Sequence, residues 1–318
     1  MRRIAAALLV PLTAAVALAG CGSSSPSASP NASVAVSGVF GKSPAVKIPA
    51  LKAGSKLQIK TEIQGSGPAL VPGDSTLANF ALYIWSGKTH KLLDSTFSTT
   101  PQVLPAQLPL PGLAKAVSGQ KMGSRVLAVL PPKYAYGTQG NSNLGIKGTD
   151  TTVWVIDLIK EFSSTAAASG KQVSNGGGRL PKVTATAGAA PTISIPKSAQ
   201  PGKLVRKTLI QGTGAPLANG QTVVAQVVGT NWRTHKTFYT TWPAASTPAS
   251  APFSFQLGGH VIPGWNKGLP GVRVGSRVML VIPPADGYGK TGNTSAGIKP
   301  TDDLVFVIDI LDSVHANA

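Results

Sequence analysis

The chain has 318 residues and a formal net charge of +18, from 29 Lys and Arg against 11 Asp and Glu, with a single cysteine. One cysteine excludes an intrachain disulfide, so stability must come from apolar cores. The basic residues are scattered over the chain and do not cluster among stacking aromatic residues, which argues against nucleic-acid binding. The positive charge is then explained by attraction to an anionic membrane or wall polymer, or by a general effect on solubility.

The first twenty residues have the features of an export signal. A basic start precedes an uncharged apolar run over 4–19 that is too short to span a bilayer comfortably. The run ends in Leu18-Ala-Gly-Cys21, which resembles a bacterial lipobox, in which the cysteine becomes the lipidated first residue. We therefore expect a signal peptide over 1–20 and a lipid anchor at Cys21 on the extracytoplasmic face of the cell membrane. Ordinary cleavage after Ala19 is the alternative.

Two segments of low complexity divide the rest of the chain. Residues 21–45 are rich in Ser, Ala, Pro and Gly, which predicts a flexible tether. Residues 163–191 consist mainly of Ala, Ser, Gly and Thr and lack a periodic apolar pattern, which predicts an interdomain linker. The two remaining segments, 46–162 and 192–313, are the expected domains.

The two domains repeat one sequence. Gly123-Ser-Arg-Val-Leu-Ala-Val-Leu-Pro-Pro, followed by Tyr136-Gly, returns as Gly275-Ser-Arg-Val-Met-Leu-Val-Ile-Pro-Pro, followed by Tyr288-Gly. The offset is 152, and 20 of the 37 aligned positions from Gly123 are identical. A period of this length predicts two homologous domains in tandem, each with its own core.

Each copy reads as a sheet with one buried face. Short Val, Ile and Leu segments alternate strictly at the end of each copy: Trp154, Ile156 and Leu158, then Phe306, Ile308 and Ile310. Asp157 and Asp309 project the other way. The helix candidates are short and follow Pro111-Gly and Pro263-Gly, so the expected class is α+β with mainly antiparallel sheet.

The second copy contains an ordered set of short motifs. The set consists of Phe253-Ser-Phe255, Leu257-Gly, Val261-Ile-Pro-Gly-Trp265, Gly275 with Pro283-Pro, Tyr288-Gly and Leu304-Val-Phe306. This set resembles the FKBP-type peptidyl-prolyl cis-trans isomerase domain. It covers most of 203–311 and recurs in weaker form over 56–159. The resemblance implies two FKBP-like domains, each a twisted antiparallel sheet of five or six strands around one short helix, with an apolar pocket between them.

The resemblance also implies prolyl isomerisation without a nucleophile, metal or cofactor. Rotation about the amide meets a barrier of roughly 20 kcal/mol because resonance is lost in the twisted state, and a dry aromatic pocket disfavours the planar amide. Trp265 would be the floor, with the Ile262 N–H and the Tyr288 hydroxyl as donors. The implied pocket of the second copy comprises Phe238, Phe253, Val261, Ile262, Trp265, Tyr288 and Phe306. Taken singly, such side chains are more often plain core.

Each copy departs from the family pattern. The pattern has a tyrosine before the first long loop and a Phe-Asp pair after it, for which the first copy has Tyr83 and Leu93-Asp94, and the second has Val228 and Phe238-Tyr239. In turn, the first copy has Leu113, Val103 and Pro101 at the positions of Trp265, Phe255 and Phe253. The implied site residues of the first copy are Tyr83, Asp94, Leu113, Tyr136 and Trp154. Asp94 is also explained as a loop-capping carboxylate.

The expected function is that of a membrane-tethered isomerase that assists folding of exported, proline-containing polypeptides outside the cytoplasmic membrane, acting as a monomer. The alternative is a non-catalytic module that binds Pro-containing or apolar segments as a chaperone or assembly factor. The four histidines, at 90, 235, 260 and 315, have no metal-ligand spacing, so neither a metal nor a cofactor is expected. His260 is placed at the pocket lip, as a substrate contact or a solvated side chain.

Overall fold

The structure is a computed structural model and describes residues 33–243 and 251–315. The expected signal peptide, Cys21 and the first part of the expected tether lie outside these residues. Within the described ranges, no helix is both long and apolar enough to cross a membrane.

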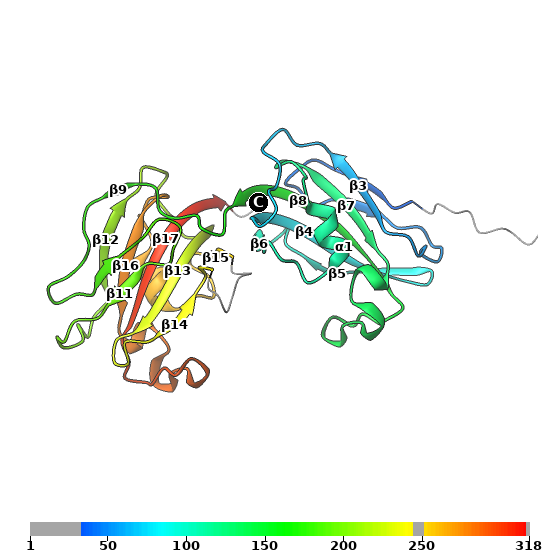
Figure 1. The fold of residues 1–318 in the computed structure, drawn as a ribbon. Coiled ribbons are helices and arrows are strands. Elements are labelled where there is room, and N and C mark those ends of the chain that lie inside the picture. Colours follow the sequence, from blue (N-terminus) through cyan, green and yellow to red (C-terminus); the bar gives the residue numbers. More distant parts are fainter. Residues whose placement is uncertain (1–32, 244–250, 316–318) are drawn as a thin grey trace, which may run out of the picture. The chain divides into compact units, whose positions relative to one another are not determined.

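The first domain is built on a six-stranded antiparallel sheet (Figure 1). The strand order is β3-β7-β8-β4-β5, with β6 paired to β4. The bounds are β3 Gln58–Ile63, β4 Ser75–Ser86, β5 Thr89–Ser95, β6 Gln102–Leu104, β7 Arg125–Leu130 and β8 Thr151–Phe162. A short helix, α1 (Pro111–Val117), and three 3₁₀ turns complete the domain: Pro132–Tyr134, Gly137–Gln139 and Ser142–Leu144.

The second domain repeats this architecture with one more strand. Its order is β14-β13-β17-β16-β12-β9, with β15 paired to β13. The bounds are β9 Lys171–Gln172, β12 Val205–Gln211, β13 Gln221–Asn231, β14 Thr237–Thr240, β15 Phe253–Gln256, β16 Arg277–Ile282 and β17 Leu304–His315. The helix is α2 (Pro263–Gly268), and the 3₁₀ turns are Pro284–Asp286, Gly289–Thr291 and Thr294–Ala296. The expected α+β class with two such domains is confirmed.

The central strands are covered on both faces. All six residues of β16 and all eleven of β13 are buried. One face packs on the helix side, where Trp265, Leu280 and Phe306 share a core. The other packs under a small hairpin, β10 (Lys182–Thr184) with β11 (Thr192–Ser194), through a second cluster that contains Val183, Trp232 and Met279. Burial on both faces explains why β16 is apolar at every position after Arg277 and does not alternate.

The first domain has the matching hairpin. Strands β1 (Ala35–Ser37) and β2 (Ala45–Lys47) pair antiparallel, and Val34 and Trp85 belong to the cluster beneath them. Both hairpins have the same register, with Val36 opposite Val46 and Val183 opposite Ile193, at an offset of 147. The repeated unit therefore includes a hairpin upstream of each sheet.

The structure thus differs from the expectation of a flexible tether over 21–45 and an unstructured linker over 163–191. The linker segment contributes β9 and β10, and β9 pairs with β12 at the sheet edge. These strands could not be predicted from the sequence because each has only two or three residues, too few for a periodic pattern. The Ser, Ala and Gly residues around these strands give the segment a composition that is typical of a linker.

A buried ion pair joins neighbouring strands in each sheet. Arg125 Nε lies 2.7 Å from Asp157 Oδ1, and Arg277 Nε lies 2.5 Å from Asp309 Oδ1, with all four side chains nearly inaccessible. A backbone N–H from the upstream segment completes each pair, because Gly41 N donates to Asp157 at 2.6 Å and Ala168 N donates to Asp309 at 2.9 Å. A buried pair is tolerated when such additional hydrogen bonds offset its desolvation. This accounts for the aspartates that project away from the helix side.

Packing of the hairpin predicts unequal effects at two valines of the same segment. Val183 is 4% exposed, whereas Val173 is 54% exposed. We expect Val183→Asp to lower the free energy of unfolding of the second domain by at least about 2 kcal/mol, because an unpaired carboxylate would be buried, and Val173→Asp to leave it nearly unchanged. Denaturant unfolding followed by tryptophan fluorescence measures both. Equal, negligible effects would show that the segment is a free linker.

Candidate active site

A pocket opens between the sheet and α2 in the second domain, with a volume of about 480 Å³. All seven residues expected there line it. Four others also do, of which Asn293 and Ala296 were not anticipated by sequence reasoning. The full lining is Phe238, Tyr239, Phe253, His260, Val261, Ile262, Trp265, Tyr288, Asn293, Ala296 and Phe306.

Aromatic rings in mutual contact form the floor and walls. Trp265 is 5% exposed, and its ring centroid lies 5.3 Å from that of Phe306 at a right angle and 5.0 Å from that of Phe255. Phe238 meets Phe306 edge to face at 5.6 Å. Such edge-to-face packing is favourable and holds each ring in one orientation. The pocket is therefore preformed by its own walls.

Trp265 is positioned by the start of α2. Pro263 occupies the first turn, where the missing N–H leaves no helix hydrogen bond unmade. Gly264 permits close packing on the sheet, since a Cβ there would lie 2.6 Å from a side-chain atom of Ile282. The indole N–H of Trp265 is buried and has no partner among the described residues. Unsatisfied buried donors are rare in folded proteins and call for a functional or structural reason.

One wall depends on a glycine in β13. A Cβ at Gly229 would lie 2.9 Å from both Phe238 Cζ and Phe306 Cε1. Gly229 is opposite Phe306 in the sheet, as Leu82 is opposite Trp154 in the first domain. Leu82 thus takes the place of Gly229, and its side chain is buried in the first core.

Two tyrosines, Tyr239 and Tyr288, line the pocket, and Tyr239 lies exposed beside Phe253. Tyr239 and Phe253 are 37% and 38% exposed, and their rings meet edge to face at 6.5 Å. Burial raises the pKa of the Tyr239 phenol, and the nearby Tyr288 phenol raises it further. Tyr239 is therefore a neutral hydrogen-bond donor at physiological pH.

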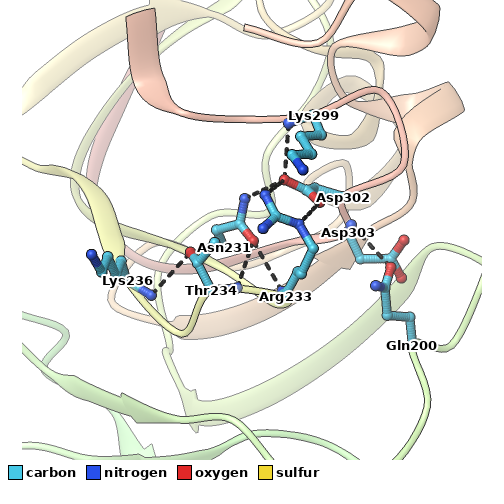
Figure 2. Close-up of polar contacts among 8 residues, drawn as sticks. All are labelled: Gln200, Asn231, Arg233, Thr234, Lys236, Lys299, Asp302 and Asp303. Carbon is cyan, nitrogen blue, oxygen red and sulfur yellow. Dashed lines mark hydrogen bonds and ion pairs between the residues drawn. The ribbon is translucent and has the colours of Figure 1, made fainter. Parts of the chain in front are cut away.

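A turn on the loop side supplies Asn293 and Ala296. Asn293 holds the loop together, since its Oδ1 accepts from Ala296 N at 3.2 Å and its backbone pairs with Ile298. Asp302 then fixes the end of the loop to β13 (Figure 2), accepting from Asn231 Nδ2 at 2.7 Å and Arg233 Nε at 2.6 Å. The pocket lip is thereby tied to the strand that carries Gly229.

The carboxyl of Asp302 is strongly acidic in the folded protein. Burial opposes its ionisation, but hydrogen bonds from Arg233, Asn231 and the Lys299 N–H outweigh burial and lower the pKa from 3.8 to about 2. A lowered pKa contributes stability above the unfolded value near 4, and this contribution is lost as the pH falls toward 2.

The Asp302 network predicts an acid-dependent loss of stability. We expect Asp302→Asn to lower the free energy of unfolding by roughly 2 kcal/mol at pH 7, the equivalent of the pKa shift, and the difference from wild type to shrink between pH 4 and pH 2. Urea unfolding at several pH values measures it. Asp150→Asn is the matched control, since Asp150 accepts from Lys147 N but has no arginine partner, and should cost less. A pH-independent difference would contradict the ionic origin.

The residues expected in the first domain do not all lie together. Leu113 and Trp154 are 3% and 7% exposed and lie in one core, against which Tyr136 packs. Asp94 is exposed on β5. Tyr83 lies on the opposite face, where it packs with Trp85 beneath the β1-β2 hairpin.

The placement of Tyr83 in the site was therefore wrong, because Tyr83 shares a strand face with Trp85 on the hairpin side. Its expected counterpart was also displaced by two residues. Tyr83 is opposite Val153 in the sheet, as Thr230 is opposite Val305, so its counterpart is Thr230 and not Val228. The strands align at an offset of 147, whereas the Thr-His-Lys match beyond the turn has an offset of 145. The matching Trp85 and Trp232 could have revealed the shift. A shift of two residues does not change the face of a strand, so Tyr83 lies on the hairpin side in either alignment.

Comparisons with known proteins agree with this geometry. Residues 68–159 and 214–311 each match the family described as FKBP-type peptidyl-prolyl cis-trans isomerase. An FK506-binding protein of Streptomyces anulatus is 35% identical over 122 residues, which are 38% of this chain and 94% of the relative. A probable FK506-binding protein of Corynebacterium glutamicum is 35% identical over 123 residues, 39% and 98% of the two chains. The isomerase FkpA of Escherichia coli K12 is 49% identical over 61 residues, 19% and 22%.

The chain belongs to the family of FKBP-type peptidyl-prolyl cis-trans isomerases and contains two such domains in tandem. The relatives support peptidyl-prolyl isomerase activity. In the part of the chain that is described, no group of three or more His, Cys, Asp or Glu side chains could hold a metal ion.

Proposed function

We propose that the second domain is the working isomerase of an exported, membrane-anchored protein that assists folding outside the cytoplasmic membrane. The observation that carries the catalytic part is the preformed aromatic pocket on the floor of Trp265. A proline ring in this pocket would leave its amide carbonyl in a water-poor surrounding, which disfavours the charge-separated planar amide relative to the twisted one. The Ile262 N–H and the phenols of Tyr288 and Tyr239 would hold the flanking carbonyls.

The first domain is proposed to lack catalysis. Leu82 replaces Gly229 and Leu113 replaces Trp265, so aliphatic side chains occupy the positions of the pocket wall and floor. Neither position therefore offers an aromatic ring or an indole N–H to a bound proline. Its role would then be structural or in binding an apolar segment.

Matched tyrosines test which domain works. We expect Tyr288→Phe to reduce kcat/KM for a short X-Pro peptide by about tenfold, the effect of losing one hydrogen bond of roughly 1.4 kcal/mol. Tyr136→Phe removes the corresponding hydroxyl from the first domain and should have no effect. The cis-to-trans rate is measured by NMR exchange. A loss with Tyr136→Phe alone would assign the activity to the first domain.

The same measurement separates catalysis from the alternative function. If the wild type binds the peptide without accelerating isomerisation, the protein is a Pro-recognition module that acts as a chaperone or assembly factor. The phenol at Tyr239, in place of the aspartate that the first domain has at 94, is the feature that favours this alternative.

The anchor rests on the signal pattern of 1–20 and the single cysteine at its end. We expect Cys21→Ala, expressed in a bacterium that lipidates exported proteins, to move the protein from the membrane to the soluble fraction. Ser23→Ala is the control and should remain in the membrane. Mass spectrometry of the N-terminal peptide should show acylation only when Cys21 is present. Unchanged membrane association of the cysteine variant would contradict the anchor.

A further inference from the structure

The charge around the second-domain pocket is one-sided. The segments that form its walls, 232–243 and 251–303, contain three acidic residues, and each is already engaged or buried. Asp286 pairs with Lys267 at 2.5 Å, Asp302 pairs with Arg233 at 2.6 Å, and Asp303 is 2% exposed. The connecting residues 244–250 contain no charged residue. No exposed carboxylate therefore faces a ligand from these walls.

Two lysines lie close in the sequence to residues that line the pocket. His260 lines the pocket and is exposed. Lys290 is exposed on the turn between Tyr288 and Asn293, both of which line the pocket, and Lys236 is exposed two residues before Phe238. Among the described residues, neither ammonium forms an ion pair with a carboxylate. The exposed charged side chains next to the lining residues in the chain are thus positive.

Tyr239 stands at the position where the first domain has a carboxylate, that of Asp94. Thr96 and Thr241 make the same hydrogen bonds, to Phe80 N and Val227 N, and thereby align Asp94 with Tyr239 at an offset of 145. Asp94 is exposed in the first domain. In the second domain, a neutral phenol next to Phe253 takes its place.

We propose that the second-domain pocket selects X-Pro segments in which X is Asp or Glu, with Tyr239 as the specificity-determining residue. The inference rests on the proposed isomerase function of this domain. The methylene groups of a glutamate would pack on the exposed rings of Tyr239 and Phe253, while its carboxylate stays in water near Lys290 and Lys236. Exposed attractions of this kind are each worth about 0.2–1 kcal/mol and weaken with salt.

Two peptides of equal shape test the selection. The full-length protein is mixed with blocked Ala-Glu-Pro-Phe or Ala-Gln-Pro-Phe, and kcat/KM is measured by NMR exchange in about 20 mM and about 500 mM salt, which bracket weak and strong screening. We expect a Glu-to-Gln ratio of about three to five in low salt and near one in high salt. Tyr239→Asp should bring the low-salt ratio below one. Lys290→Gln should lower it, and Lys207→Gln, which removes an exposed charge from β12, should not.

The outcomes separate this inference from the function beneath it. If neither peptide is isomerised, the proposed function fails. If the Gln peptide is isomerised and the low-salt ratio is one or less, only the acidic preference is overturned. A preference for Glu that persists in high salt, or survives Tyr239→Asp, would also contradict it, since the selection would then not be electrostatic.

Discussion

Coverage of the sheet on both faces is the constraint on which the rest of this structure depends. A sheet whose central strands are apolar on both sides needs two covers, the helix on one face and the hairpin on the other. The buried pairs of Arg125 with Asp157 and Arg277 with Asp309 are possible only because the upstream segment closes over them and donates an N–H. Because these ion pairs lie on the hairpin side, the helix side can leave a pocket open.

The two domains show how one framework holds either a site or a core. Register, buried ion pairs and turn capping agree between them, with Asn141 and Asn293 each capping a 3₁₀ turn. The difference lies in a few side chains on the helix side. Where Gly229 makes room for Phe238 and Phe306, Leu82 fills the equivalent space, and an open aromatic pocket is replaced by aliphatic packing.

The sequence predicted the fold and the second pocket well, because the residues involved are ordered motifs with a second copy for comparison. The seven expected residues, from Phe238 to Phe306, line one cavity. The prediction failed for very short strands and for the orientation of one side chain. Three-residue strands such as β10 carry too little pattern to distinguish them from a linker. Strand β4 is buried along most of its length, so its sequence shows no alternation that would assign Tyr83 to the hairpin side. The contribution of Asn293 and Ala296 depends on loop geometry, which sequence patterns do not specify.

The shared hairpin register also records how the chain arose. Because β1-β2 and β10-β11 stand at one constant distance from the strands that follow them, each hairpin belongs to the repeated unit. The repeated unit is thus longer than the segments 68–159 and 214–311 that match the family, and in the second copy it begins no later than β10. A chimera or domain exchange joined at 192 would separate Asp309 from Ala168 and leave a sheet face bare.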